Sequence, residues 1–120
     1  MRRLIAAILV LGLLASGPAA AQTLSEATYR RLSEIHAHID AAEFAVALDK
    51  LDKLLPALRR DDYAQALVLQ TYGFIHAQQG AYREAAGFFQ RALALEALPA
   101  PQVEQLQYGL AQFHVALEAY

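Results

Sequence analysis

Three equally spaced histidines indicate that this 120-residue chain contains an internal repeat. They are His38, His76 and His114. The shift that places His38 on His76 also aligns Phe44 with Tyr82 and Tyr120, Ala42 with Gly80 and Glu118, Ala47 with Ala85, Leu51 with Phe89, and Leu54 with Ala92. Periods of about 20–50 residues are typical of stacked supersecondary units, which bury their apolar faces only against each other. The repeat therefore predicts the architecture but identifies no ligand.

The first residues have the pattern of a cleavable signal peptide. Two arginines precede an almost wholly apolar run, residues 4–15, and three alanines end at Ala21. The apolar run is well short of the roughly 20 residues that span a bilayer, which disfavours a membrane anchor. We expect residues 1–21 to be a signal peptide, the exported chain to start at Gln22, and its location to be the periplasm.

The chain that follows the expected signal peptide is acidic. Removal of 21 of the 120 residues leaves 99, enough for one small domain. Two of the ten basic residues lie in the removed segment, so eight remain against twelve acidic residues, a net charge of about −4. No basic cluster exceeds the pairs Arg30–Arg31 and Arg59–Arg60. We therefore expect no nucleic-acid partner, and we find no further apolar run that could span a membrane.

From Gln22 onward, apolar residues recur at helical steps. The first predicted helix covers residues 24–40, with a capping box formed by Thr23 and Glu26. The second covers residues 43–58, and Pro56 is expected to end or bend it.

Three more helices are predicted in the second half of the chain. The third is capped by Asp61 or Asp62 and runs to residue 79, before Gly80. The fourth runs from residue 81 or 82 to about residue 97. The fifth begins at Pro101, a favourable first helical residue. We therefore predict an all-α fold of antiparallel helix hairpins, with about five helices.

Residues in the second unit follow the spacing of a known helical repeat. They are Leu69, Tyr72, Gly73, His76, Gly80, Tyr82, Ala85, Phe89 and Ala92. The pattern resembles the tetratricopeptide repeat, whose period is about 34 residues. The resemblance covers roughly residues 28–120 and implies a right-handed solenoid with units at about 28–65, 66–103 and an incomplete 104–120.

This chain departs from the family pattern at several positions. Leu69 stands where the family has tryptophan, His76 where it has tyrosine, and the closing proline arrives late, at Pro99. The period set by His38, His76 and His114 is also longer than the family's, which predicts longer first helices or longer links.

The resemblance implies a further helix for the third unit, beginning near Tyr120. Without that helix, we expect Leu110, Phe113 and Leu117 to lack a covering partner. Two explanations stay open: this chain is the front of a longer protein, or another chain covers the face. The second explanation would make the chain a self-association module with an open C-terminal end.

The resemblance also implies that the first helices of successive units line a concave, aromatic and amide-rich groove. The groove positions carried onto this chain are Tyr29, Leu32, His36, Leu67, Gln70, Phe74, Gln105, Tyr108 and Gln112. Some family members clamp a C-terminal carboxylate with Lys, Arg and Asn, and none of those residue types is in this set. We therefore expect a protein or peptide partner with apolar anchors.

The histidines and the remaining polar residues suggest no chemistry. His36 and His38 are two residues apart on a predicted helix, so their rings point about 200° from each other and cannot readily share an ion. We expect partly buried, structural histidines at positions 38, 76 and 114, and no metal or other cofactor. A metal or small-solute carrier is the weakest alternative. Because the sequence lacks a nucleophile motif, a phosphate loop and cysteine, we expect no enzyme activity.

The C-terminal part carries a narrower resemblance. Leu95, Leu98–Pro99, Tyr108, Leu110–Ala111–Gln112 and Tyr120 resemble the periplasmic tetratricopeptide accessory proteins of TonB energy-transduction systems. The leading hypothesis is therefore an exported, all-α interaction scaffold that serves an envelope complex.

Overall fold

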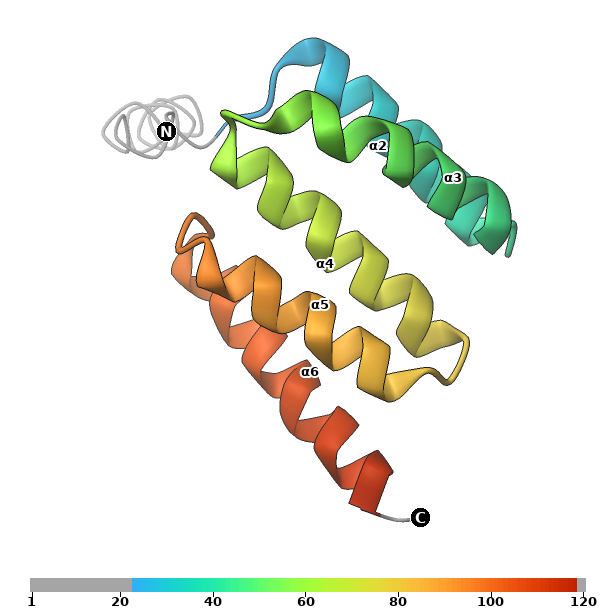
Figure 1. Cartoon of the computed structure of the whole chain (residues 1–120), viewed down its shortest axis with the longest axis vertical. Helices are drawn as coiled ribbons and strands as arrows, with labels where there is room; N and C mark the ends of the chain where they lie inside the picture. The colour runs from blue at the N-terminus through green and yellow to red at the C-terminus, as the bar shows by residue number, and fades with distance from the viewer. Residues whose placement is uncertain (1–22, 119–120) are drawn as a thin grey trace, which may run out of the picture.

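The computed structural model describes residues 23–118, which form five α-helices, a short 3-10 helix and no strand. The helices are α2 (Glu26–Asp40), α3 (Phe44–Leu54), α4 (Asp62–Gln78), α5 (Tyr82–Ala94) and α6 (Ala100–Glu118), and the 3-10 helix is η2 (Leu55–Leu58). Helices that follow each other in the chain lie side by side (Figure 1). The predicted all-α class with five helices is confirmed. The expected signal peptide lies outside the described residues.

The helix ends follow local capping chemistry, with one correction to the prediction. The cap of α2 is Ser25, whose Oγ accepts from the Thr28 backbone N–H at 3.1 Å, so the predicted box formed by Thr23 and Glu26 is wrong. At α4 the Asp61 carboxylate accepts from the Ala64 N–H at 3.0 Å, as predicted. Pro56 lies in η2, where the helix changes from α to 3-10 geometry.

The turns after α2 and α4 share one geometry and occupy equivalent positions of the sequence repeat. Ala42 and Gly80 both have a left-handed backbone, with φ of 59° and 78°. The next residue closes each turn with a backbone bond of 2.8 Å, from Glu43 N–H to the His38 carbonyl and from Ala81 N–H to the His76 carbonyl. The sequence repeat therefore corresponds to a structural repeat of two helix hairpins.

This equivalence predicts opposite stability changes at the two turns. A left-handed alanine costs about 1–2 kcal/mol, more than the roughly 0.5–1 kcal/mol of chain entropy that glycine loses on folding. Ala42→Gly should therefore raise the free energy of unfolding by about 0.5–1 kcal/mol, and Gly80→Ala should lower it by a similar amount. Urea unfolding followed by circular dichroism measures both. Changes of the same sign would contradict the shared turn geometry.

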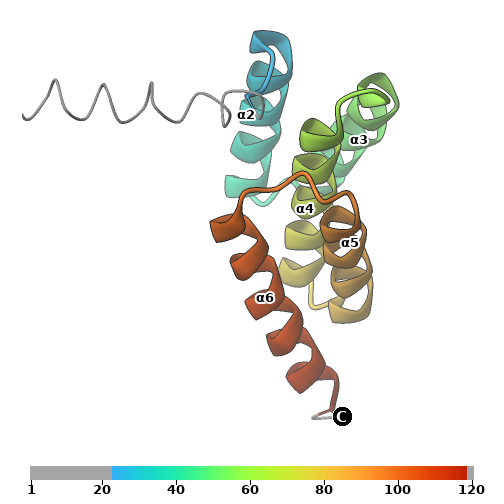
Figure 2. The same cartoon turned by 90° about the vertical axis from the view of Figure 1, so that its left-hand side faces the viewer.

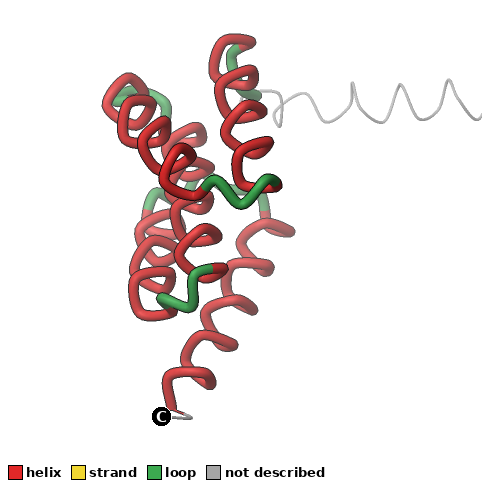
Figure 3. Tube along the Cα trace, turned by 90° about the vertical axis from the view of Figure 1, so that its right-hand side faces the viewer, coloured by secondary structure: helices red, strands yellow, loops and turns green. Residues whose placement is uncertain are grey.

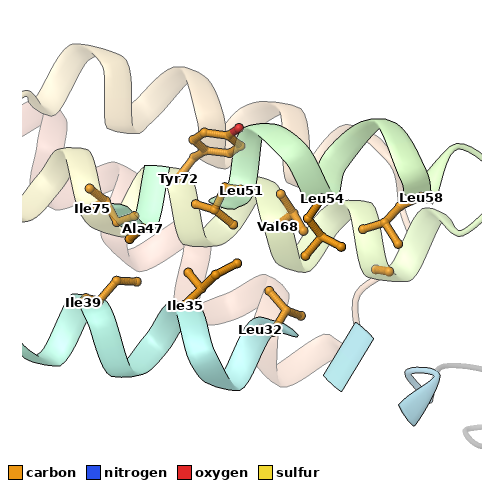
Figure 4. Close-up of a cluster of buried hydrophobic side chains, with 11 residues drawn as sticks. Leu32, Ile35, Ile39, Ala47, Leu51, Leu54, Leu58, Val68, Tyr72 and Ile75 are labelled. Atoms are coloured by element: carbon orange, nitrogen blue, oxygen red, sulfur yellow. The ribbon is translucent and has the colours of Figure 1, made fainter. Parts of the chain in front are cut away.

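The first apolar core joins α2, α3 and α4. Leu32, Ile35 and Ile39 of α2 lie on one face, as predicted, and meet buried residues of the two neighbouring helices (Figure 4). The largest fully buried side chains there are Ile35, Leu51, Ile75 and Val68. Because α4 packs on both helices of the first hairpin, its core links the first hairpin to the second.

The second core is centred on Phe89 of α5. Its ring lies between two glycines, because a Cβ at Gly73 of α4 would meet Phe89 Cε1 at 2.5 Å and a Cβ at Gly109 of α6 would meet Phe89 Cε2 at 2.8 Å. The ring of Phe113 on α6 completes the contact, with centroids 5.2 Å apart. Two missing side chains thus let three helices share one aromatic ring.

The prediction that Leu110, Phe113 and Leu117 lack a covering helix is wrong. Phe113 is buried and stacks on Tyr82, with ring centroids 5.8 Å apart. Leu110 packs against the same core, and Leu117 is half-buried. The physical reason is rotational: α6 turns this apolar stripe toward α5, which buries Phe113 and leaves Leu110 and Leu117 half-buried.

The C-terminal end of α5 also differs from the prediction, because the helix ends at Ala94 instead of about residue 97. Glu96 has a left-handed φ of 53°, which cannot continue an α-helix.

The helices are divided between two sides of the molecule. Figures 2 and 3 show α3 and α5 on one side, α2 and α6 on the other, and α4 between them. The predicted groove residues come from α2 and α6, which share one side, and from α4, which lies between the two sides. Within residues 23–118, no helix is long and apolar enough to cross a membrane.

Candidate binding surface

A hollow of about 180 Å³ lies between α2 and α4, the first helices of the two hairpins. Five of the nine predicted groove residues line it: Tyr29, Leu32, His36, Leu67 and Gln70. Three residues that the sequence reasoning missed complete its wall, namely Leu24, Ser33 and Thr71. We call this site the α2/α4 hollow.

The missed residues follow from helix geometry. Ser33 lies one turn after Tyr29 on α2, and Thr71 lies one turn after Leu67 on α4. A search that extended each predicted stripe by a four-residue step would have found both. Leu24 precedes α2, and only the folded chain brings it to the wall.

The residues of the hollow are held by local hydrogen bonds and burial. Ser25 Oγ caps α2 and also contacts the Thr28 hydroxyl at 2.9 Å, which fixes the start of the helix below Tyr29. On α4, Thr71 is buried and its hydroxyl donates to the Leu67 carbonyl at 2.7 Å. Leu32 is buried and Leu67 half-buried, whereas Tyr29 is 64% exposed. The hollow therefore has an apolar inner wall and an exposed aromatic rim.

The chemistry of the hollow is uncharged. Its eight lining residues include no carboxylate, ammonium or guanidinium group, and His36 is its one titratable imidazole. The amide oxygen of Gln70 is buried without a hydrogen-bond partner. An apolar cavity of about 150 Å³ in another protein holds benzene, so this hollow has room for one aromatic or large aliphatic side chain. Burial of a charged group there would be costly.

The other four predicted groove residues lie outside this hollow. Tyr108 and Gln112 line a shallower surface on α6 together with Ala111 and Val115. Phe74 is exposed one helical turn beyond Gln70 on α4, and Gln105 is exposed on α6, one turn before Tyr108. The structure thus brings five of the nine together and leaves two exposed aromatic rings, Phe74 and Tyr108, on the neighbouring helices.

The three equally spaced histidines have different surroundings. His38 is partly buried, with Nδ1 2.7 Å from Glu43 Oε1, and His76 is partly buried and stacked on Phe88, with ring centroids 5.3 Å apart. His114 is exposed, so the prediction of a partly buried histidine there is wrong. The reason is that none of the described helices covers that flank of α6. Among the described residues, no three His, Asp or Glu side chains gather where they could hold a metal ion.

A stack of aromatic rings explains the surroundings of His76. Phe88 stacks on Tyr72 as well, with centroids 4.8 Å apart, and the Arg91 guanidinium lies 5.4 Å from its centroid. The Tyr72 hydroxyl donates to Asp52, and burial together with this carboxylate raises the pKa of the Tyr72 hydroxyl. The stability contributed by neutral Tyr72 is therefore present below its ordinary pKa near 10 and is lost as the pH rises further. This cluster ties α3, α4 and α5 together.

Comparisons with protein-family models, curated proteins and solved structures find no match to this chain.

Proposed function

We propose that this chain is a non-catalytic interaction scaffold that binds a protein partner through an uncharged, apolar anchor residue. The observation that carries the proposal is the α2/α4 hollow, an apolar site formed by two helices from different hairpins. Its size suits one large side chain, and its lack of charge favours a neutral one. The exposed rings of Tyr29, Phe74 and Tyr108 would then contact the rest of the partner segment.

The finer architecture and location are part of the same proposal. A tetratricopeptide-like solenoid is supported by the residue spacing of the second unit and by the matched turns at Ala42 and Gly80. The periplasmic location rests on the sequence pattern of residues 1–21. A role as an accessory of a TonB-type envelope complex rests on the narrower resemblance of residues 95–120.

Affinity co-purification from the native envelope tests whether this surface binds a partner. We expect the wild type to retain a protein that Phe74→Ala/Tyr108→Ala loses, because Phe74 lies one turn beyond Gln70 of the hollow and Tyr108 is the exposed ring of the α6 surface. Val46→Ala is the matched control, since Val46 is 43% exposed and Phe74 is 47% exposed, but Val46 lies on α3. Retention of the same partner by the double variant would contradict the proposed surface.

Ser33→Glu tests the hollow itself. Ser33 is exposed at the wall of the hollow, so the carboxylate should leave folding intact while making the site unfavourable for an apolar anchor. We expect the partner's Kd to rise at least about tenfold, equivalent to roughly 1.4 kcal/mol. Ser33→Ala, which adds no charge, should leave the affinity within about threefold. Equal affinity of the glutamate variant and the wild type would show that the anchor binds elsewhere.

A further inference from the structure

A second hollow, of about 240 Å³, lies on the outer flank of the first hairpin and is lined only by residues of α2 and α3. Its floor is formed by Ile35 and Leu54, and its rim carries Arg31, Lys50, Lys53 and one carboxylate, Glu34. On α2, the α2/α4 hollow uses Tyr29, Leu32 and His36 instead, so the two sites occupy different flanks of the helix. We call this second site the basic edge.

The basic edge has uncompensated positive charge. Among the described residues, Arg31 and Lys50 have no ion-pair partner, whereas Lys53 pairs with the exposed Asp49 at 3.1 Å. Three of the chain's ten basic residues thus meet at one site, although the whole chain has a net charge of −2. The site favours an acidic, partly apolar surface.

Helix α6, at the other end of the row of helices, has the complementary negative charge. Helix α6 contains Glu104 and Glu118 and no Lys or Arg, and both carboxylates lack an ion-pair partner in the part of the chain that the structure describes. They lie on the flank of α6 that faces away from α5, and the exposed residues of this flank are Glu104, Gln107, Ala111, His114 and Glu118. We call this flank the acidic edge. Its two carboxylates are about 21 Å apart along the helix, and Ala111 between them leaves room for close approach.

These two edges cannot meet within one molecule. The first hairpin and α6 lie at opposite ends of the row of helices, separated by α4 and α5 (Figure 1). A second copy stacked in the same direction would bring its acidic edge to the basic edge of the first. Such a head-to-tail contact continues the order in which α4 packs on the first hairpin, and because it does not close on itself it forms a chain of copies.

We propose that the basic edge binds the acidic edge of a second copy, so that the protein self-associates head to tail. This inference is independent of the α2/α4 hollow, because neither edge includes a residue of it, although Ala111 of the acidic edge also lines the shallower α6 surface with Tyr108. It also replaces the predicted association through Leu110, Phe113 and Leu117, whose stripe packs on α5. Exposed ion pairs are individually weak and screened by salt, so the contact is expected to be weak and to weaken further in high salt.

Sedimentation velocity of the purified protein over a concentration series tests the proposal. We expect the wild type to associate at low salt, and Lys50→Glu/Lys53→Glu or Glu104→Lys/Glu118→Lys to lower the association constant at least about tenfold, because each places like charges together. Arg59→Glu/Arg60→Glu is the matched control for the basic-edge variant, since it makes the same charge change at two exposed residues outside both edges and should associate like the wild type. Circular dichroism checks that each variant is folded.

A mixture of the two edge variants provides the decisive result. In the mixture, the reversed basic edge of one variant faces the reversed acidic edge of the other, and their unchanged edges also have opposite charges. Association should therefore return to within about threefold of the wild type, although each variant alone associates at least about tenfold more weakly. A monomeric wild type, equal weakening by the Arg59/Arg60 control, or a mixture that remains monomeric would each overturn the proposal. Binding of acidic peptides to a monomeric wild type would assign the basic edge to another protein instead.

Discussion

Replacement of Phe89 by alanine should lower the free energy of unfolding by about 3–5 kcal/mol. The buried ring is the contact that α4, α5 and α6 share, and the glycines on either side cannot fill the space that it would leave. Small domains have a total stability of only about 5–15 kcal/mol, so this loss is a large fraction of it. Urea unfolding followed by circular dichroism measures the change.

Phe74→Ala is the matched control for that experiment. Phe74 is also a phenylalanine and lies next to Gly73, but its ring is exposed, so its removal should change the free energy of unfolding by less than about 0.5 kcal/mol. If the two substitutions had equal effects, the second core would not depend on Phe89.

Gly73→Ala should lower the free energy of unfolding by about 1–3 kcal/mol. In an open helix the same change is stabilising, because alanine has the better helix propensity by roughly 0.8–1 kcal/mol. At Gly73, however, the new Cβ would meet the Phe89 ring and lie 3.1 Å from the Ala85 carbonyl oxygen, which belongs to backbone and cannot move freely. Steric overlap should therefore outweigh propensity.

Gly87→Ala separates these two effects. Gly87 lies within α5, and a Cβ there would meet nothing within 4 Å, so the substitution should raise the free energy of unfolding by about 0.5–1 kcal/mol. Thermal melting of the two alanine variants beside the wild type measures both changes. A stabilised Gly73→Ala variant would mean that α4 and α5 are less closely packed than the structure has them.

The helices and the repeat could be predicted from sequence because their causes are local. Apolar residues at three- and four-residue steps mark the faces that pack, and the stripe of Leu32, Ile35 and Ile39 is buried as expected. The alignment of the chain with itself also identified equivalent turns, even where alanine at position 42 replaces the glycine that such a turn favours. Alanine at position 42 does not by itself indicate a left-handed turn, but the similarity of the flanking residues to those around Gly80 does.

Other features depend on contacts that no local pattern encodes. Thr23 and Ser25 both have side chains that can cap a helix. Which of them caps α2 depends on where the helix begins to pack into the core, and this start places the N–H of the buried Thr28 next to Ser25. The rotation of α6 about its own axis depends on whether its apolar stripe packs against α5 or against another helix. The sequence shows only that Leu110 and Phe113 share a stripe, whereas the ring of Phe89 decides what the stripe packs against.

Many of the residues that line the candidate site could be predicted from the sequence, but the hollow itself could not. Spacing along α2 and α4 identified five of the residues that line the α2/α4 hollow, because residues one turn apart share a helix face. Which of those faces becomes a hollow depends on the distance between helices, which the core side chains set. For the same reason, Phe74 and Gln105 were assigned to one groove with the others, although in the structure they line neither the α2/α4 hollow nor the α6 surface around Tyr108.

Site-specific photo-crosslinking in cells tests the binding surface most directly. A photoreactive amino acid at Ser33, at the wall of the α2/α4 hollow, is compared with the same residue at Gln90, an exposed position on α5. The proposed function predicts that position 33 forms a covalent adduct with one protein other than this chain and that position 90 does not. Adducts from position 90 alone, or the same adducts from both positions, would contradict a partner that anchors between α2 and α4.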